Sequence, residues 1–195
     1  MSKKESVDFF VEERMTKETK VKICLSTSRS FFQGSTGLRF FDHMLSTFSL
    51  YSGLGLKLEV CESLDGIAHH LIEDVGIVFG RVFRKAFDYS KVKRYGEATV
   101  PMDEALVGAY VDLSGRPYFL KNFEFIGAYI EDFPTEAFEE FIRGFSNNAK
   151  ITVHFVKFSG RNEHHVIEAC FKAFGLAIRK AVQPSQFLST KGMID

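Results

Sequence analysis

The stretch of sequence that decides the fold occurs twice, as HHLIEDVGIVFGRVFRKAF at residues 69–87 and as HHVIEACFKAFGLAIRKAV at residues 164–182. Placed over each other without a gap, the two segments agree at 9 of 19 positions, including both histidines and the glutamate that follows them. Agreement at that level over an ungapped stretch exceeds chance, and it indicates that the chain contains two copies of one unit.

The sequence upstream of each histidine pair repeats the same layout. The block FDHML at residues 41–45 falls over FEEFI at residues 138–142. In the first copy 26 residues separate His43 from the pair, and in the second 24 residues separate Glu140 from the pair. The duplication therefore includes more than the helix that carries the histidines.

Each copy has the pattern of a sheet covered by helices. Apolar residues recur at helical spacing after the histidine pairs, and runs with strand composition precede them. The expected strands are residues 20–25, 54–61, 106–113, 118–125 and 151–158. We predict an α+β fold of two tandem repeats, each an antiparallel four-stranded sheet with two helices packed on one face. The expected units are residues 1–92, residues 93–185 and a C-terminal tail at 186–195.

Composition limits the class of partner. With 195 residues and 45% hydrophobic side chains, the chain can bury a real core. Its 25 basic residues offset 25 acidic ones, which argues against nucleic acid or an anionic membrane and favours a small molecule. The three cysteines form no C-x-x-C pair, no apolar run approaches the roughly 18 residues of a membrane helix, and MSKKESVDFF lacks a signal-like apolar segment. We expect an unprocessed cytoplasmic protein.

The repeated histidines have the spacing of metal ligands. Residues four apart share a helix face, so His69 with Glu73, and His164 with Glu168, could each hold one ion. The adjacent His70 lies about 100° further round the helix and would face a different ion, one that another subunit could share, and its repeat counterpart would do the same. Nitrogen and carboxylate ligands together suit Mn²⁺, Fe²⁺ or Zn²⁺.

A simpler interpretation competes with metal binding, because a histidine beside a carboxylate is usually an ordinary surface pair. The occurrence of the same histidine and glutamate pattern at equivalent positions of both copies favours metal binding over that interpretation. Five of the six histidines lie in the repeated blocks, namely His43, His69, His70, His164 and His165. The sixth, His154, falls within a strand pattern, and we interpret it as structural.

Several blocks together resemble the imidazole-glycerol-phosphate dehydratase family. They are FFDHML (40–45), HHLIEDVGIVFG (69–80), RYGEATVPMDEA (94–105), DLSGRPY (112–118), GRNEHHVIEACFKAFGLAIRKA (160–181) and STKG (189–192). The resemblance covers nearly the whole chain, and the combination of blocks is more specific than any one of them.

The resemblance implies a metal-dependent lyase of histidine biosynthesis that converts imidazole glycerol phosphate to imidazole acetol phosphate and water. It implies two divalent transition-metal ions per subunit, with Mn²⁺ as the expected ion, and a homo-oligomer built from trimers into a 24-subunit shell. Two ions on the ring nitrogens would favour an imidazolate, and loss of the hydroxyl would then give a diazafulvene-like intermediate.

Residue roles follow from the same resemblance. The implied metal ligands are His43, His69, His70, Glu73, Glu140, His164, His165 and Glu168. The implied catalytic residues are Glu18, Glu73 and Glu168, with Glu18 as the candidate for proton transfer. The implied substrate-binding residues, mostly for the phosphate, are Glu18, Arg94, Arg116, Lys172, Ser189, Thr190 and Lys191.

Plainer interpretations stay open for several of these positions. Arg94, Arg116 and Lys172 could be solvated surface cations. Residues 103–104 could form only a turn or a cap, and residues 189–192 could be a frayed tail.

The chain departs from the family pattern near the expected site. Glu140 stands where the family has a second-repeat histidine, which changes the charge around one ion. Ile67 and Ala68 replace acidic residues before the first pair, removing expected partners for its histidines. Ser46 and Tyr51 replace an aspartate and a histidine, and the Leu-Asp-Gly-Thr-Gly turn is absent from residues 25–28.

Three other functions remain possible after these departures. One is an inactive paralogue that still binds metal and assembles, and a second is a metal-storage or structural assembly. The third is a metallohydrolase of another small phosphorylated substrate. We favour an active dehydratase because the phosphate-binding candidates and seven of the eight ligands of the family pattern are retained.

Overall fold

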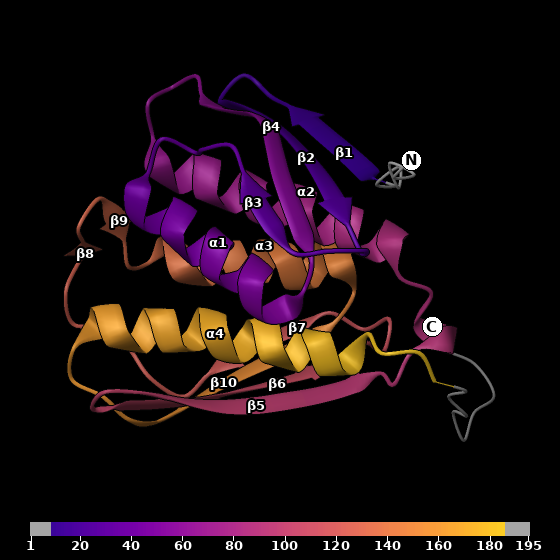
Figure 1. Cartoon of the computed structure of the whole chain (residues 1–195). Helices are drawn as coiled ribbons and strands as arrows, with labels where there is room; N and C mark the ends of the chain where they lie inside the picture. Colours follow the sequence, from indigo (N-terminus) through magenta and orange to yellow (C-terminus); the bar gives the residue numbers. More distant parts are fainter. Residues whose placement is uncertain (1–8, 186–195) are drawn as a thin grey trace, which may run out of the picture.

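The computed structural model describes residues 9–185 and places a layer of helices between two four-stranded sheets (Figure 1). The first sheet has the order β1 (Phe10–Met15), β2 (Thr19–Ser26), β4 (Gly55–Ser63) and β3 (Phe31–Gln33). The second has the order β5 (Tyr95–Met102), β6 (Ala105–Asp112), β10 (Thr152–Ser159) and β7 (Tyr118–Lys121). The helices are α1 (Arg39–Ser52), α2 (Ala68–Ala86), α3 (Ala137–Ala149) and α4 (Glu163–Ala181), and a short 3₁₀ turn, η1 (Tyr89–Lys91), leads to the second sheet.

The two sheets share one topology, which confirms the predicted duplication of a sheet-and-helix unit. In each, the first three strands in space pair antiparallel, whereas the last, β3 or β7, pairs parallel to its neighbour. The sheets are therefore mixed, and the expectation of purely antiparallel pairing was wrong at this edge. The reason is the connection: α1 lies between β3 and β4, and α3 between β7 and β10, and a helical crossover joins parallel strands.

The helices pair across the two halves rather than within them. Helix α2 packs on α3, and α1 packs on α4. A Cβ on Gly80 of α2 would lie 2.5 Å from the carbonyl oxygen of Phe145, and one on Gly175 of α4 would lie 3.0 Å from that of Phe48. Gly80 and Gly175 occupy equivalent positions in the two copies, and so do Phe48 and Phe145. Each helix crossing thus depends on the same glycine, which lets two backbones approach closely.

Phenylalanine rings fill the space between the paired helices. Phe41 of α1 meets Phe141 of α3 at 5.2 Å between ring centroids, and Phe48 meets Phe174 of α4 at 5.2 Å. These contacts join the two halves, and the rings are at most 1% exposed. Most of the phenylalanines within residues 9–185 are buried, and their rings form one core shared by both copies.

All four helices begin at the same end of the molecule, on the left of Figure 1. The contacts agree, because Gly76 and Gly80 of α2 meet Phe141 and Phe145 of α3 in the same order along the chain. The helix N-termini carry partial positive charge, which favours carboxylates nearby. The repeated histidines all lie in the first two turns of their helices, so this end gathers the candidate ligands.

The second half has an insertion that the first half lacks. Residues 122–136 join β7 to α3 and contain the small hairpin β8 (Tyr129–Ile130) and β9 (Phe133–Pro134). Asp132 of this hairpin accepts hydrogen bonds from the backbone N–H of Arg39 at 2.6 Å and of Phe40 at 3.1 Å. The insertion therefore caps α1 of the first half, whose own N-cap, Leu38, has no side chain that could do so.

No helix within residues 9–185 is both long enough and apolar enough to cross a membrane.

Candidate metal and substrate site

Three predicted ligands meet where α1 packs on α4. The Nε2 atom of His43 lies 3.6 Å from Oε2 of Glu168, and Nε2 of His164 lies 3.4 Å from the same oxygen. Ligand atoms about 2.1 Å from a transition-metal ion lie roughly 3.0–3.4 Å from one another. The two imidazoles and the carboxylate therefore nearly have the spacing of one coordination sphere, and the ligands come from both halves of the chain.

Glu168 makes different contacts with its two oxygens. Oε2 faces the histidines, and Oε1 accepts a hydrogen bond from the ammonium of Lys172 at 2.9 Å. Burial raises the pKa of Glu168, but the hydrogen bond and charge of Lys172 together with the nearby histidines outweigh it, and the net shift is downward. Glu168 is thus held as a carboxylate, the form that ligates a metal. Lys172, expected to bind phosphate, lies beside this cluster.

The equivalent cluster would form where α2 packs on α3, from His69, Glu73 and Glu140. Both glutamates are half-buried, and Gly144, one turn after Glu140, approaches the carbonyl oxygen of Glu73. The helix pairing therefore brings Glu140 to the helix that carries the other two. Within residues 9–185, however, no hydrogen bond or ion pair joins these three side chains, and Nδ1 of His69 lies instead 3.6 Å from Oε1 of Glu136.

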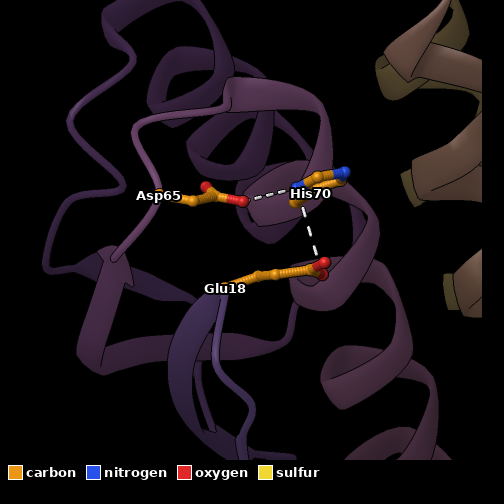
Figure 2. A group of neighbouring side chains, drawn as sticks. All are labelled: Glu18, Asp65 and His70. Carbon is orange, nitrogen blue, oxygen red and sulfur yellow. Dashed lines mark hydrogen bonds and ion pairs between the residues drawn. The ribbon is translucent and has the colours of Figure 1, made fainter.

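His70 lies between two carboxylates, as Figure 2 shows. Its Nδ1 is 2.6 Å from Oδ2 of Asp65 and 3.9 Å from Oε2 of Glu18, and the three groups form a compact cluster of possible ligands. The hydrogen bond with Asp65 raises the pKa of His70 and lowers that of Asp65. The expectation that His70 loses its acidic partner was wrong, because Asp65 in the β4–α2 loop replaces the missing residue.

The turn that carries Glu18 is fixed to α2. Thr19, the next residue, donates a hydrogen bond to Oδ2 of Asp74, and Nε of Arg14 donates to Oδ1 at 2.6 Å. Asp74 is buried, so this contact ties the β1–β2 hairpin to the helix that carries His69 and His70. The side chain of Glu18 itself is exposed, as a group that meets a substrate must be.

His165 has an equivalent environment in the second half. Its Nδ1 lies 2.7 Å from Oε2 of Glu104, and its Nε2 lies 3.7 Å from Oδ2 of Asp103. The hydrogen bond from His165 lowers the pKa of Glu104 to about 2, and the same bond raises the pKa of His165. Residues 103–104 do form the β5–β6 turn, as the plainer interpretation held, but both acidic side chains also face a predicted ligand.

Besides Asp103, sequence reasoning missed four carboxylates near the histidines. Asp65 and Glu104 contact the second histidine of each pair, while Glu131 lies 3.3 Å from Nδ1 of His164 and Glu136 lies near His69. Only Asp65 carried a local signal, since Asp-Gly at residues 65–66 marks a turn just before the helix. The other three reach their histidines from distant parts of the chain.

A surface pocket lies beside His164. It has a volume of about 560 Å³ and is bounded by the insertion at Ile126–Ile130 and by Arg161, Asn162 and Glu163. The insertion therefore shapes the space next to one candidate metal cluster.

Two of the predicted phosphate-binding residues, Arg94 and Arg116, lie away from these clusters, unlike Lys172. Arg94 donates to Asp112 at 2.5 and 3.1 Å, and its backbone N–H donates to the carbonyl of Ala181. Ala181 and His164 stand at opposite ends of α4, roughly 25 Å apart at about 1.5 Å per residue. Arg116 follows β6 at the same far end as Arg94. Ser189, Thr190 and Lys191 lie outside the described residues.

Known proteins resemble this chain over nearly its whole length. A sequence model of the family described as imidazoleglycerol-phosphate dehydratase matches residues 36–178. The imidazoleglycerol-phosphate dehydratase of Thermotoga neapolitana is 60% identical over 185 residues, covering 95% of this chain and 95% of that protein. The one of Bacillus cytotoxicus is 43% identical over 189 residues, covering 94% and 97%.

Two crystal structures show the same architecture. Imidazoleglycerol-phosphate dehydratase from Staphylococcus aureus matches with a TM-score of 0.81 and 36% identity, covering 91% of this chain and 100% of that one. The Pyrococcus furiosus protein, in complex with (S)-C348, matches with a TM-score of 0.79 and 35% identity, covering 93% and 99%.

Proposed function

Because this chain belongs to the imidazoleglycerol-phosphate dehydratase family, we propose that it converts imidazole glycerol phosphate to imidazole acetol phosphate and water in histidine biosynthesis. The observation that carries the proposal is the meeting of His43, His164 and Glu168 at the α1–α4 contact. The three residues lie within the matched segment, and their side chains supply the donor atoms that a metal-dependent lyase requires.

We propose two divalent transition-metal ions per subunit. One would be held by His43, His164 and Glu168, and the other by Glu140 with His69 and Glu73. The donor set of imidazole nitrogens and carboxylate oxygens fits Mn²⁺, and the spacing in the first cluster fits one ion. When bound, such ions supply Lewis-acid assistance that favours the imidazolate form of the substrate ring. The half-buried His70 and His165 are the remaining candidate ligands.

Glu18 is the candidate for proton transfer. It is exposed beside His70, on a turn that Asp74 holds in place, so its position is defined while its carboxylate stays accessible. The reaction requires removal of one proton from carbon, and we assign that step to Glu18. The hydroxyl on the neighbouring carbon leaves with a proton as water. The enol that remains takes up a proton at carbon, loses the proton of its hydroxyl and becomes the ketone of the product.

The geometry of one chain favours sites shared between subunits. Arg94 stands roughly 25 Å from His164, which is farther than a small phosphorylated substrate can reach. If Arg94 and Arg116 bind the phosphate, the metal ligands near that phosphate come from another copy. We therefore propose a homo-oligomer, built from trimers into a 24-subunit particle. The tail residues Ser189, Thr190 and Lys191 and the ammonium of Lys172 complete the proposed phosphate-binding set.

The test uses the purified full chain with Mn²⁺ and imidazole glycerol phosphate, and it follows imidazole acetol phosphate. We expect product to form, to stop on chelation and to return when Mn²⁺ is restored. Glu168→Gln should abolish turnover, while Glu97→Gln, a carboxylate change on β5 away from the clusters, should leave it unchanged. Release of inorganic phosphate without the ketone product would indicate a hydrolase. Metal binding and assembly without either product would indicate an inactive or storage protein.

A further inference from the structure

His70 and His165 are held in the same way by carboxylates that occupy different places in the two copies. Asp65 comes from the loop before α2, five residues ahead of His70. Glu104 comes from the β5–β6 turn, 61 residues ahead of His165. The same arrangement of a carboxylate on Nδ1 is thus built from two different positions of the repeat.

Each carboxylate uses one oxygen to fix its own position and the other to hold the histidine. Oδ1 of Asp65 accepts from the backbone N–H of Ile67 at 2.9 Å and from the hydroxyl of Ser63 at 3.2 Å, while Oδ2 lies 2.6 Å from Nδ1 of His70. Gly66, with φ of 76°, allows the turn that brings these groups together. Asp65 is thus anchored independently of the imidazole.

Glu104 divides its oxygens in the same manner. Oε1 accepts from the backbone N–H of Asn162 at 2.8 Å and of Arg161 at 3.2 Å, and Oε2 lies 2.7 Å from Nδ1 of His165. The two backbone groups belong to the loop just before α4, so Glu104 ties the hairpin turn to the start of the helix. Asn162 also approaches Nε2 of His165 with its side-chain amide, at 3.3 Å.

These contacts determine which imidazole nitrogen is available. An ionised carboxylate only accepts hydrogen bonds, so the proton of the neutral ring must lie on Nδ1. Nε2 then keeps its lone pair. In His165 an amide N–H of Asn162 can donate to this lone pair, so an ion bound at Nε2 would take the place of that hydrogen bond. Figure 2 shows that the second nitrogen of His70 points away from both Asp65 and Glu18. Within residues 9–185, no hydrogen bond or ion pair involves this nitrogen.

We propose that Asp65 and Glu104 are positioning residues, which hold His70 and His165 through Nδ1 so that Nε2 is oriented toward a metal ion. The proposal rests on the proposed function, because it assumes that the two histidines are ligands. It assigns no direct metal bond to either carboxylate. At 2.6–2.7 Å the oxygen and nitrogen are closer than two ligands of one ion, which lie roughly 3.0–3.4 Å apart, and they have the separation of a charge-assisted hydrogen bond.

The test measures Mn²⁺ binding to the metal-free full chain by the loss of the free-ion EPR signal. Asp65→Asn and Glu104→Gln keep the shape and one oxygen of each side chain but remove its charge. We expect each to weaken Mn²⁺ binding by about 10–100-fold, with the number of ions bound at saturation unchanged. Glu62→Gln removes a nearby exposed carboxylate on β4, and this variant should bind Mn²⁺ as the wild type does. Ser63→Ala removes the hydrogen bond from Ser63 to Asp65 but leaves the one between Asp65 and His70. Its affinity for Mn²⁺ therefore shows how much a disturbance of the loop alone contributes.

A double variant distinguishes positioning from general stability. If Asp65 acts only through His70, Asp65→Asn should have no further effect on affinity in a His70→Gln background, and Glu104→Gln should have none in His165→Gln. Unchanged affinity in the single variants, or fully additive losses in the double variants, would overturn the inference. Loss of one bound ion per chain in Asp65→Asn would make Asp65 a ligand and also overturn it. A wild type that binds no Mn²⁺ would overturn the proposed function and, with it, the inference.

Discussion

At the scale of residues, the candidate ligands could be predicted because their spacing is local. His69 and Glu73, and His164 and Glu168, stand four residues apart on helices that the apolar pattern already indicates. Asp65 and Glu104 could not be predicted, because their contacts with His70 and His165 depend on how a loop and a hairpin turn fold back. Periodicity describes which face a residue occupies, but it does not describe what a distant loop places against that face.

Glu140 is the residue where this chain departs most from the family pattern, and it gives a direct prediction. It lies half-buried on α3, opposite the helix that carries His69 and Glu73. Glu140→Ala should lower Mn²⁺ occupancy because one oxygen ligand is lost, whereas Glu140→His should retain it. Elemental analysis of the purified variants measures both. Equal metal content in Glu140→Ala and the wild type would place Glu140 outside the metal site.

Glu59 predicts a pH effect away from any metal ligand. On β4 it accepts from Lys22 at 2.8 Å and from Lys57 at 3.0 Å, and these hydrogen bonds lower its pKa to about 2. A carboxylate with a lowered pKa stabilises the fold above its ordinary value near 4.5, and that contribution disappears as the pH falls toward 2. The difference in Tm between the wild type and Glu59→Gln should therefore be small and positive at pH 6 and shrink toward pH 3. Because the group is exposed, the difference should also decrease with added salt.

At the scale of elements, the helices and five of the strands could be predicted, since β2, β4, β6, β7 and β10 overlap the expected segments. β1 and β5 alternate clearly but were not expected, and β3, with three residues, is too short for a clear period. The parallel pairing of β3 and β7 depends on the crossover through α1 or α3, which a strand pattern does not reveal. The β8–β9 hairpin was also missed, because each of its strands has only two residues.

The helix crossings predict a large effect for a small change. Gly80→Ala would place a methyl group 2.5 Å from the carbonyl of Phe145, so α2 and α3 must move apart, and we expect a loss of about 1–3 kcal/mol in unfolding free energy. Gly144→Ala is the matched control, since its nearest contact is 3.0 Å and the neighbours need shift only slightly. Urea unfolding of the metal-free proteins measures both. Equal losses of unfolding free energy in the two variants would show that the 2.5 Å contact at Gly80 does not determine the stability of the helix crossing.

At the scale of the whole molecule, the distances within one chain predict how the particle responds to metal removal. The proposed ligands lie on helix ends at one side, while the proposed phosphate-binding arginines lie at the other, so a complete site needs neighbouring copies. Chelation should shift the particle to a smaller oligomer, and Mn²⁺ should restore it. Light scattering coupled to size exclusion measures the mass before and after. A mass that stays constant once all metal is removed would contradict shared sites.

The two repeats could be predicted from the sequence, but the pairing of each helix with a helix of the other repeat could not. His43 belongs to the first repeat, and it meets His164 and Glu168 of the second. Such pairing depends on the packing of glycines and phenylalanines at crossings between distant helices, and no local pattern encodes which helix a face will meet.

The pairing of helices across the two repeats has a consequence for the history of the gene. A half-length ancestor could have built a site like the α1–α4 cluster only by dimerising with itself, and its two sites would then have been identical by symmetry. Fusion of two copies removed that requirement, because a mutation in one half no longer appeared in the other. His43 and Glu140 occupy equivalent positions in the two copies, and they are the kind of difference that fusion permits.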